Sequence, residues 1–191
     1  MEPCFIEERS FEKEDFRVNP LTQGEYDNCR FSNCDFYNAD LSEVVFSECL
    51  FTGCNLSLAV LKKTAFRDAR FVNCKMLGLQ FENCNAAGFS LSFENCSLNH
   101  SSFYKTKLKK TTFRNTQLQE ADFTECDLTA SVFDNCDLAK ATFENTVIER
   151  ADFRTSYNYS IDPEGNRIKK ARFSLQGIAG LLDKYGIEIE H

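Results

Sequence analysis

The chain has 191 residues, a length typical of a single domain. It carries 22 Lys and Arg residues against 29 Asp and Glu residues, and the net charge of −7 argues against ordinary binding to nucleic-acid phosphates. No apolar run is long enough to cross a membrane, and the residues after Met1 do not form a basic segment followed by an apolar one. We therefore expect one cytoplasmic domain with no direct nucleic-acid or membrane partner.

Large apolar side chains recur at every fifth residue through most of the chain. From Tyr26 this spacing continues to Phe81, resumes at Phe93 and extends to Phe153. A helix repeats its apolar face every three to four residues and a half-buried strand every two, so neither produces a period of five. The pattern predicts a short structural repeat.

The repeating unit reads small, polar, large apolar, polar, polar. Examples are residues 34–38 (Cys-Asp-Phe-Tyr-Asn) and 121–125 (Ala-Asp-Phe-Thr-Glu). Two inward positions per unit would fill a narrow interior, and three outward positions would face water. The sequence therefore predicts a solenoid rather than a globular core.

Over residues 24–155 this motif resembles the pentapeptide-repeat family. The resemblance implies an all-β fold, a right-handed quadrilateral parallel β-helix with four pentapeptides per coil. About six coils at a strand spacing of roughly 4.8 Å would give a rod about 30 Å long. Phe alternates with Leu or Ile from Phe93 onward, so with four units per coil the Phe columns are expected on two opposite faces.

The ten cysteines all occupy the small position of the unit, two residues before a position of the five-residue apolar spacing. This position otherwise holds mainly Ala, Ser and Thr, so we expect buried, reduced thiols that act as small hydrophobic side chains. Cys29 and Cys49, or Cys34 and Cys54, would stack on successive coils near disulfide distance, but a reducing cytosol opposes the bond. No metal site and no cofactor is expected. The cysteines are Cys4, Cys29, Cys34, Cys49, Cys54, Cys74, Cys84, Cys96, Cys126 and Cys136.

Residues 1–23 keep the apolar spacing but hold Arg9, Glu14 and Asn19 in the small positions. Charged and amide side chains are poor occupants of a tight interior. We therefore expect residues 1–23 to form an N-terminal cap or an irregular coil.

The repeat is broken at residues 85–92, because Phe81 and Phe93 are separated by two residues more than two units. One interpretation is a bulge or kink between two parts of the repeat. The other is a small projecting contact loop, since loops on rigid scaffolds often carry binding residues. The candidate loop residues are Ala87, Gly88, Phe89 and Ser90.

After Phe153 the pattern stops, and residues 156–191 are expected to form a C-terminal capping or dimerisation module. We expect strands over residues 157–161 and 168–173 with a turn between them, then a helix from an N-cap at Ser174 to Gly186, and a short strand at residues 187–189. Such a short helix does not hide its own apolar face. Candidate dimer contacts are Phe173, Leu175, Ile178, Leu182 and Tyr185.

The sequence contains no recognisable catalytic arrangement. The two histidines have no evident partner, and there is neither a phosphate-binding glycine-rich loop nor a zinc-protease motif. We therefore expect a binding protein and not an enzyme.

Residues 71–78 and 171–175, together with the rest of the chain, resemble the topoisomerase-protecting branch of the family. That branch comprises the Qnr quinolone-resistance proteins, the albicidin-resistance protein and the microcin B17 immunity protein, and the chain resembles the latter two more closely. The resemblance implies a head-to-head homodimer that binds DNA gyrase, or topoisomerase IV, and protects it from a poison by partial DNA mimicry or poison release. The alternative is a structural or scaffolding repeat protein that binds an unrelated protein.

An acidic stretch without Lys or Arg is the candidate gyrase contact, because it would steer the protein toward a basic DNA-binding groove. The same acids are also explained simply as outward polar positions of the repeat. DNA would not present a basic stretch such as residues 105–114. Any mimicry of DNA by this protein would therefore be one-sided. The candidate residues are Asp122, Glu125, Asp127, Asp134 and Asp137.

Overall fold

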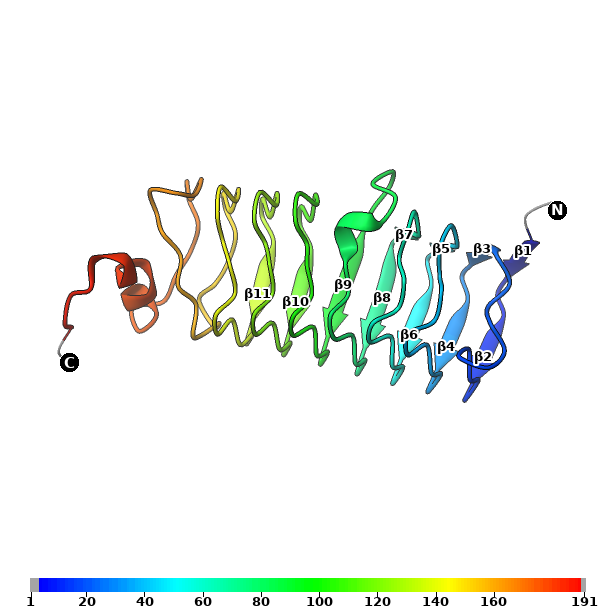
Figure 1. The fold of residues 1–191 in the computed structure, drawn as a ribbon. Coiled ribbons are helices and arrows are strands. Elements are labelled where there is room, and N and C mark those ends of the chain that lie inside the picture. Colours follow the sequence, from blue (N-terminus) through cyan, green and yellow to red (C-terminus); the bar gives the residue numbers. More distant parts are fainter. Residues whose placement is uncertain (1–3, 190–191) are drawn as a thin grey trace.

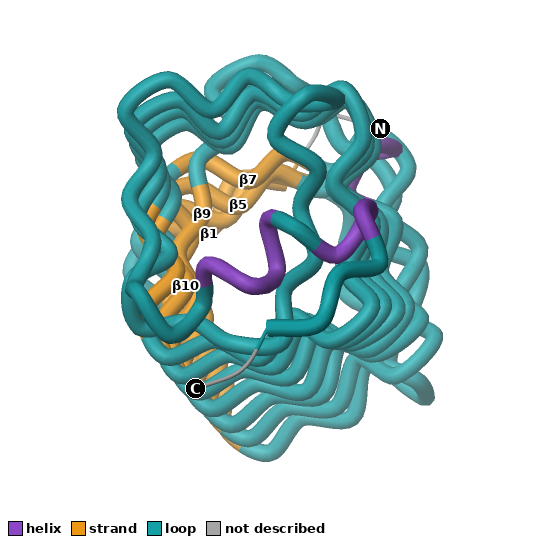
Figure 2. The backbone as a smooth tube through the Cα atoms, turned by 90° about the vertical axis from the view of Figure 1, so that its left-hand side faces the viewer, coloured by secondary structure: helices purple, strands orange, loops and turns teal. Residues whose placement is uncertain are grey.

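The computed structural model describes residues 4–189, which form a parallel β-solenoid with almost no helix. Strand β4 (Arg30–Ser32) pairs with β6 (Leu50–Thr52) so that Phe31 lies opposite Phe51, an offset of 20 residues. One coil therefore contains four pentapeptides. The coils stack into a rod with the two chain ends at opposite ends (Figure 1), and the outline along the rod axis is four-sided (Figure 2).

We number the four sides of the coil as faces 1 to 4 in chain order. Face 1 begins with a four-stranded sheet of β1 (Cys4–Glu7), β3 (Gly24–Asp27), β5 (Val45–Ser47) and β7 (Ala65–Arg67). Face 2 is a seven-stranded sheet of β4 and β6 with β2 (Ser10–Glu12), β8 (Ala69–Val72), β9 (Leu91–Glu94), β10 (Thr112–Arg114) and β11 (Val132–Asp134). On faces 3 and 4, successive coils are joined only by single parallel bridges. Examples are the bridge from Asp35 to Asn55 on face 3 and the bridge from Asp122 to Thr142 on face 4.

The last residue of most units has a left-handed backbone, which turns the chain onto the next face. The φ angle is +54° at Asn33 and +53° at Asn38. Asn adopts this conformation at lower cost than most residues. The Asn33 N–H still donates to the Thr52 carbonyl at 2.8 Å in the next coil. The polar character of the fifth position thus follows from backbone geometry as well as from exposure.

Stacked aromatic rings fill the interior. On face 2 the Phe113 ring lies 5.1 Å from Phe93 and 4.8 Å from Phe133, and on face 4 Phe103 lies 5.0 Å from Phe123. The two columns meet edge to face, which is a favoured aromatic geometry. The predicted Phe columns on two opposite faces are confirmed. Burial of each such ring contributes about 1.5–3 kcal/mol of transfer free energy.

All ten cysteines are free, and eight of them are buried, so the predicted role as small interior side chains is confirmed for those eight. Seven of the eight buried thiols point at carbonyl groups of the preceding coil, as in the 3.2 Å contact from Cys49 Sγ to the Tyr26 oxygen. The eighth, Cys126 Sγ, lies 3.3 Å from the hydroxyl of Thr106. Cys4 and Cys84 are half-exposed, because one lies in the first coil and the other at the break. Within residues 4–189 no group of three or more His, Cys, Asp or Glu side chains is arranged to hold a metal ion.

The parallel pairing between successive coils extends further toward both ends of the chain than the regular sequence motif does. In the first coil β1 pairs with β3 and β2 with β4, while Arg9, Glu14 and Asn19 point into solvent. At the other end Asp152 bridges Arg172, and the ring of Phe173 stacks 5.4 Å from Phe153. The stack therefore extends past residue 155 to a last coil that carries fewer motif residues.

The prediction of a helix from Ser174 to Gly186 is wrong. The chain forms two short 3₁₀ turns, η2 (Ile178–Leu181) and η3 (Asp183–Tyr185), and Ser174 Oγ accepts a 3.0 Å hydrogen bond from the Gly177 N–H just before them. The strands expected over residues 157–161 and 168–173 are reduced to single bridges, and residues 187–189 form no strand. None of the helices among the described residues is long and apolar enough to span a bilayer.

Close packing on the last coil explains this outcome. A Cβ atom at Gly177 would lie 2.0 Å from Tyr159 Oη, and one at Gly180 would lie 2.0 Å from the Tyr159 carbonyl oxygen. The Gly180 carbonyl also accepts a 2.9 Å hydrogen bond from the Ile161 N–H. These two glycines allow the turns to lie across the end of the solenoid (Figure 2).

Candidate functional site

The five candidate acidic residues lie on different faces of the rod. Because they are close in sequence, they follow the chain around the coil and do not form one patch. The structure places Asp122 on face 4, Glu125 at the corner between faces 4 and 1, Asp127 on face 1, Asp134 on face 2 and Asp137 on face 3. One flat partner surface cannot contact all five.

Three of these acids are paired with cations of the preceding coil. The basic stretch at residues 105–114 lies directly beneath the acidic stretch, because the coil offset of 20 residues brings the two into register. Exposed ion pairs of this kind contribute only about 0–1 kcal/mol each, but they neutralise the local acidic potential. The pairs are Lys105 with Glu125 at 3.5 Å, Lys109 with Asp127 at 3.1 Å, and Arg114 with Asp134 at 3.3 Å.

Asp122 and Asp137 have no cationic partner within residues 4–189. Asp122 accepts a 2.8 Å hydrogen bond from the Thr124 N–H, and Asp137 accepts 2.7 Å and 2.8 Å bonds from the Gln119 and Asn158 amides. Partial burial would raise the pKa of Asp137, but the bonds from Asn158 and Gln119 lower it below its usual 3.8. Asp137 is therefore ionised at neutral pH and keeps an uncompensated charge.

The break at residues 85–92 follows the 3₁₀ turn η1 (Phe81–Asn83) and bulges from the regular stack (Figure 1). Ala87 and Gly88 are exposed at its tip, and Gly88 has a φ of +72°, a conformation that favours glycine. Phe89 is half-buried, with its ring 6.5 Å from Phe81. Ser90 Oγ donates a 2.8 Å hydrogen bond to Asp68. Only the tip of the loop therefore projects.

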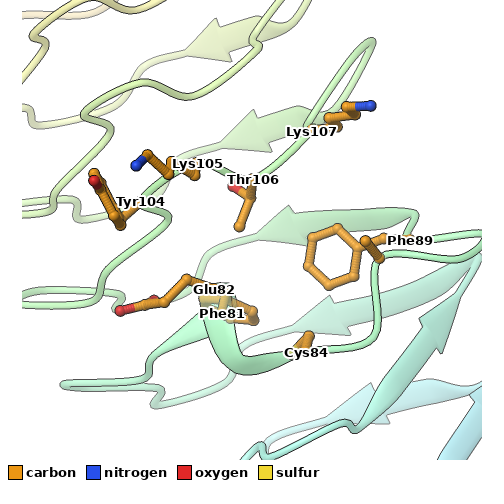
Figure 3. Close-up of a pocket in the computed structure, with 9 residues that line it drawn as sticks. Phe81, Glu82, Cys84, Phe89, Tyr104, Lys105, Thr106 and Lys107 are labelled. Carbon is orange, nitrogen blue, oxygen red and sulfur yellow. The ribbon is translucent and has the colours of Figure 1, made fainter.

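A cavity of about 370 Å³ lies between the break and the following coil. Its walls are mainly apolar, and the ring of Phe89 and the side chains of Cys84 and Thr106 face the same space (Figure 3). Burial raises the pKa of the Cys84 thiol, so the thiol is protonated at neutral pH and is a poor nucleophile. The cavity is therefore suited to binding and not to thiolate chemistry.

The sequence reasoning did not identify the residues across the cavity. In the sequence Phe81 belongs to the regular five-residue spacing, and Thr106 and Lys107 lie within the basic stretch at residues 105–114. Their role arises because the break opens the contact between two coils. The only indication in the sequence is the pair of extra residues between Phe81 and Phe93. These residues show that one coil is irregular, but they do not show on which face the cavity forms.

The C-terminal turns expose apolar side chains at the end of the rod. Leu175 is 83% exposed, and Ile178 and Tyr185 are also exposed. Leu182 is half-buried, and Phe173 is half-buried on the Phe153 ring. Three of the five candidate dimer contacts are therefore well exposed, and the other two partly support the module itself.

Coils of four five-residue units, with ladders of buried Phe and Cys side chains and polar outer faces, define a parallel pentapeptide solenoid. The family model described as a pentapeptide repeat region matches residues 24–92 and 79–153. The chain belongs to this family, as its sequence motif indicated. No curated protein sequence matches the chain.

Solved structures share the fold at low sequence identity. A trypsin-treated form of QnrB1, a plasmid-mediated fluoroquinolone resistance protein, matches with a TM-score of 0.56 and 21% identity, covering 98% of this chain and all of its own. A second trypsin-treated form of QnrB1 gives a TM-score of 0.53 and 19% identity, with 99% and 100% coverage. HetL, a pentapeptide repeat protein involved in heterocyst differentiation regulation in a Nostoc cyanobacterium, gives 0.65 and 16%, with 91% and 86% coverage.

Proposed function

We propose that this protein is a non-enzymatic, cytoplasmic binding protein that protects DNA gyrase, or topoisomerase IV, from a topoisomerase poison. The observation that supports this function is the end-to-end structural match to QnrB1, a fluoroquinolone resistance protein, over 98% of this chain. The outward positions of a solenoid are free to carry a partner-specific surface, because the fold depends on the inward ones. The poison is a quinolone, albicidin or a peptide such as microcin B17.

The electrostatic part of the contact is assigned to Asp122 and Asp137. These two carboxylates lie on adjacent faces 4 and 3, so one partner surface can reach both. Glu125, Asp127 and Asp134 are each paired with a cation and present less net charge to a DNA-binding groove. The DNA mimicry proposed for this protein is therefore partial and confined to one edge of the rod.

The double substitution Asp122→Lys and Asp137→Lys is expected to weaken binding to immobilised gyrase about tenfold, mostly through the association rate, because both charges would steer toward a basic groove. Biolayer interferometry at low and moderate salt measures the effect. Asp134→Lys on face 2 is the matched control, expected to stay within about threefold. Equal affinity of the double variant and the wild type would contradict the electrostatic contact.

The rival function is a regulatory or scaffolding role with an unrelated protein partner. The observation that favours it is the match to HetL, a protein involved in differentiation control, at a TM-score of 0.65. The two functions differ in whether purified gyrase is bound at all. Absence of gyrase and topoisomerase IV binding by the wild-type protein would leave the scaffolding function.

We also propose a head-to-head homodimer through the exposed apolar side chains of the C-terminal turns. Leu175→Asp is expected to give a monomer, because a charge would be buried in the interface. Light scattering coupled to size exclusion measures the mass. Leu58→Asp is the matched control, since Leu58 is also exposed, at 49%, but lies on the body of the rod. A monomeric wild type, or dissociation by both variants, would refute this dimer.

A further inference from the structure

Face 1 has an internal edge at the break. The sheet β1-β3-β5-β7 ends at β7, and the bridges of this face resume only where Lys107 pairs with Asp127, followed by Val147 and Arg167. Where the stack is regular, the backbone N–H of the residue before the large apolar one donates to the coil before it on this face. Asp127 N–H, for example, donates to the Thr106 carbonyl at 2.9 Å. Face 2, by contrast, runs across the same region as one continuous sheet.

The backbone hydrogen-bonding groups of Lys107 are unpaired at this edge. Within the part of the chain that the structure describes, its N–H has no acceptor and its C=O has no donor. By the register of the later coils, the N–H faces Cys84, whose carbonyl is likewise unpaired. Such groups form a ready template for another strand. Here the unpaired groups of the edge belong to a single residue, Lys107, and they lie beside the apolar cavity.

One large apolar side chain is missing from the same place. The five-residue spacing puts the inward position of this unit at Ala86, but Ala86 is small and exposed because the break carries it outward. Phe89 fills the space only in part, and the cavity of about 370 Å³ remains between Phe81, Cys84, Phe89 and Thr106. The cavity is therefore adjacent to the unpaired backbone groups and has the apolar character of the missing residue.

The charged residues that line the cavity are Lys105, Lys107 and Glu82, and Glu82 lies on the side of Tyr104, away from Lys107 (Figure 3). Lys107 forms no ion pair with any residue between positions 4 and 189. The Lys105 ammonium lies 4.7 Å from the centre of the Tyr104 ring and 3.5 Å from Glu125, which leaves its charge only partly compensated. Acidic groups on an occupant would meet Lys107 without displacing an existing partner.

We propose that this gap binds an extended acidic peptide segment of a partner protein, which adds to face 1 as the missing unit. The peptide backbone pairs with the N–H and C=O of Lys107, and one large apolar side chain of the peptide enters the cavity. This is strand addition, in which main-chain hydrogen bonds give affinity and a side-chain pocket gives selectivity. Peptide binding in this gap does not depend on gyrase being the partner.

The probe is the capped pentapeptide Ac-Ala-Asp-Phe-Thr-Glu-NH₂, which copies the acidic unit at residues 121–125. Titration into ¹⁵N-labelled full-length protein, followed by amide shifts, is expected to give a Kd of about 0.1–1 mM with the largest changes at Lys107, Phe89 and Thr106. Hydrogen exchange of the Lys107 amide is expected to be fast in the free protein, unlike that of Asp127, and to slow when the peptide is bound.

Two matched controls isolate the cavity. Ala86→Trp places a large side chain at an exposed residue that lines the cavity, and it is expected to weaken peptide binding at least about tenfold. Ala87→Trp makes the same change at the adjacent exposed residue, which does not line the cavity, and is expected to stay within about twofold. The peptide with Ser in place of Phe keeps the charge and backbone but is expected to lose most of the affinity.

Several outcomes would overturn the proposal. They are the absence of shifts at about 5 mM peptide, equal binding of the Phe and Ser peptides, unchanged affinity in Ala86→Trp, and a slowly exchanging Lys107 amide in the free protein. Binding of 1-naphthoate at the same residues without binding of the peptide would also overturn it, since it would make the cavity a small-molecule site.

Discussion

Phe113→Ala is expected to lower the free energy of unfolding by about 3–5 kcal/mol, the largest effect of any single substitution considered for this protein. Phe113 is fully buried in the middle of the face 2 column, stacked on Phe93 and Phe133 and edge-on to Phe103 and Phe123. The substitution removes the ring and both stacking contacts. The neighbouring coils cannot close the cavity, because the backbone ladder fixes their spacing.

Urea unfolding followed by circular dichroism measures this loss. Phe5→Ala is the matched control, because Phe5 is 61% exposed on β1, and the same substitution there is expected to change stability by no more than about 0.5 kcal/mol. Equal destabilisation by the two substitutions would show that the Phe columns do not hold the coils together.

The free energy of unfolding is expected to fall steeply above about pH 9. Burial raises the pKa of the Cys49, Cys126 and Cys136 thiols from 9.0 to about 12. The folded chain therefore keeps protons that the unfolded chain releases near pH 9. The stabilisation is complete below that value and is lost as the pH rises toward 12. Each thiol removes up to about 1.4 kcal/mol per pH unit, so the three together remove about 4 kcal/mol per unit near pH 10–11.

Urea midpoints at pH 8, 9, 10 and about 10.5 test the sign and the slope. Cys49→Ala, Cys126→Ala and Cys136→Ala combined form the control, since alanine occupies the same small position at Ala121 and Ala151. The triple variant is expected to show a clearly flatter decline. Parallel curves for the variant and the wild type would assign the alkaline loss to other groups.

The repeat could be predicted from the sequence because its determinants are local. Each unit carries its own large residue, its own small residue and a corner residue such as Asn33 that tolerates a positive φ. The positions of Phe113 and Cys49 in the core therefore follow from their phase in the five-residue pattern, without knowledge of distant contacts. The same reasoning correctly placed the alternating Phe columns on opposite faces.

The acidic surface could not be predicted by reading neighbours along the chain. Residues such as Asp122 and Asp137 are close in sequence yet lie on different faces, whereas Lys109 and Asp127 lie 18 residues apart and form an ion pair. In a solenoid the spatial neighbours are about 20 residues apart. The charge balance of a face appears only when the sequence is written coil above coil.

The two irregular regions depend on tertiary contacts. The apolar spacing of Leu175, Ile178 and Leu182 indicated a helix, but packing of Gly177 and Gly180 against Tyr159 produces 3₁₀ turns instead. At the break, the sequence showed two extra residues but not their effect on face 1. The unpaired backbone of Lys107 results from the path of residues 85–90, which no local pattern specifies.

The most direct test of the proposed function is a supercoiling assay with purified gyrase, relaxed plasmid and a poison, repeated with albicidin, microcin B17 and a quinolone. The account predicts that increasing amounts of the wild-type protein restore supercoiling in the presence of at least one poison, and that the Asp122→Lys and Asp137→Lys double variant needs about tenfold more protein. Failure to restore supercoiling with any of the three poisons, together with no inhibition of gyrase at excess protein, would contradict it.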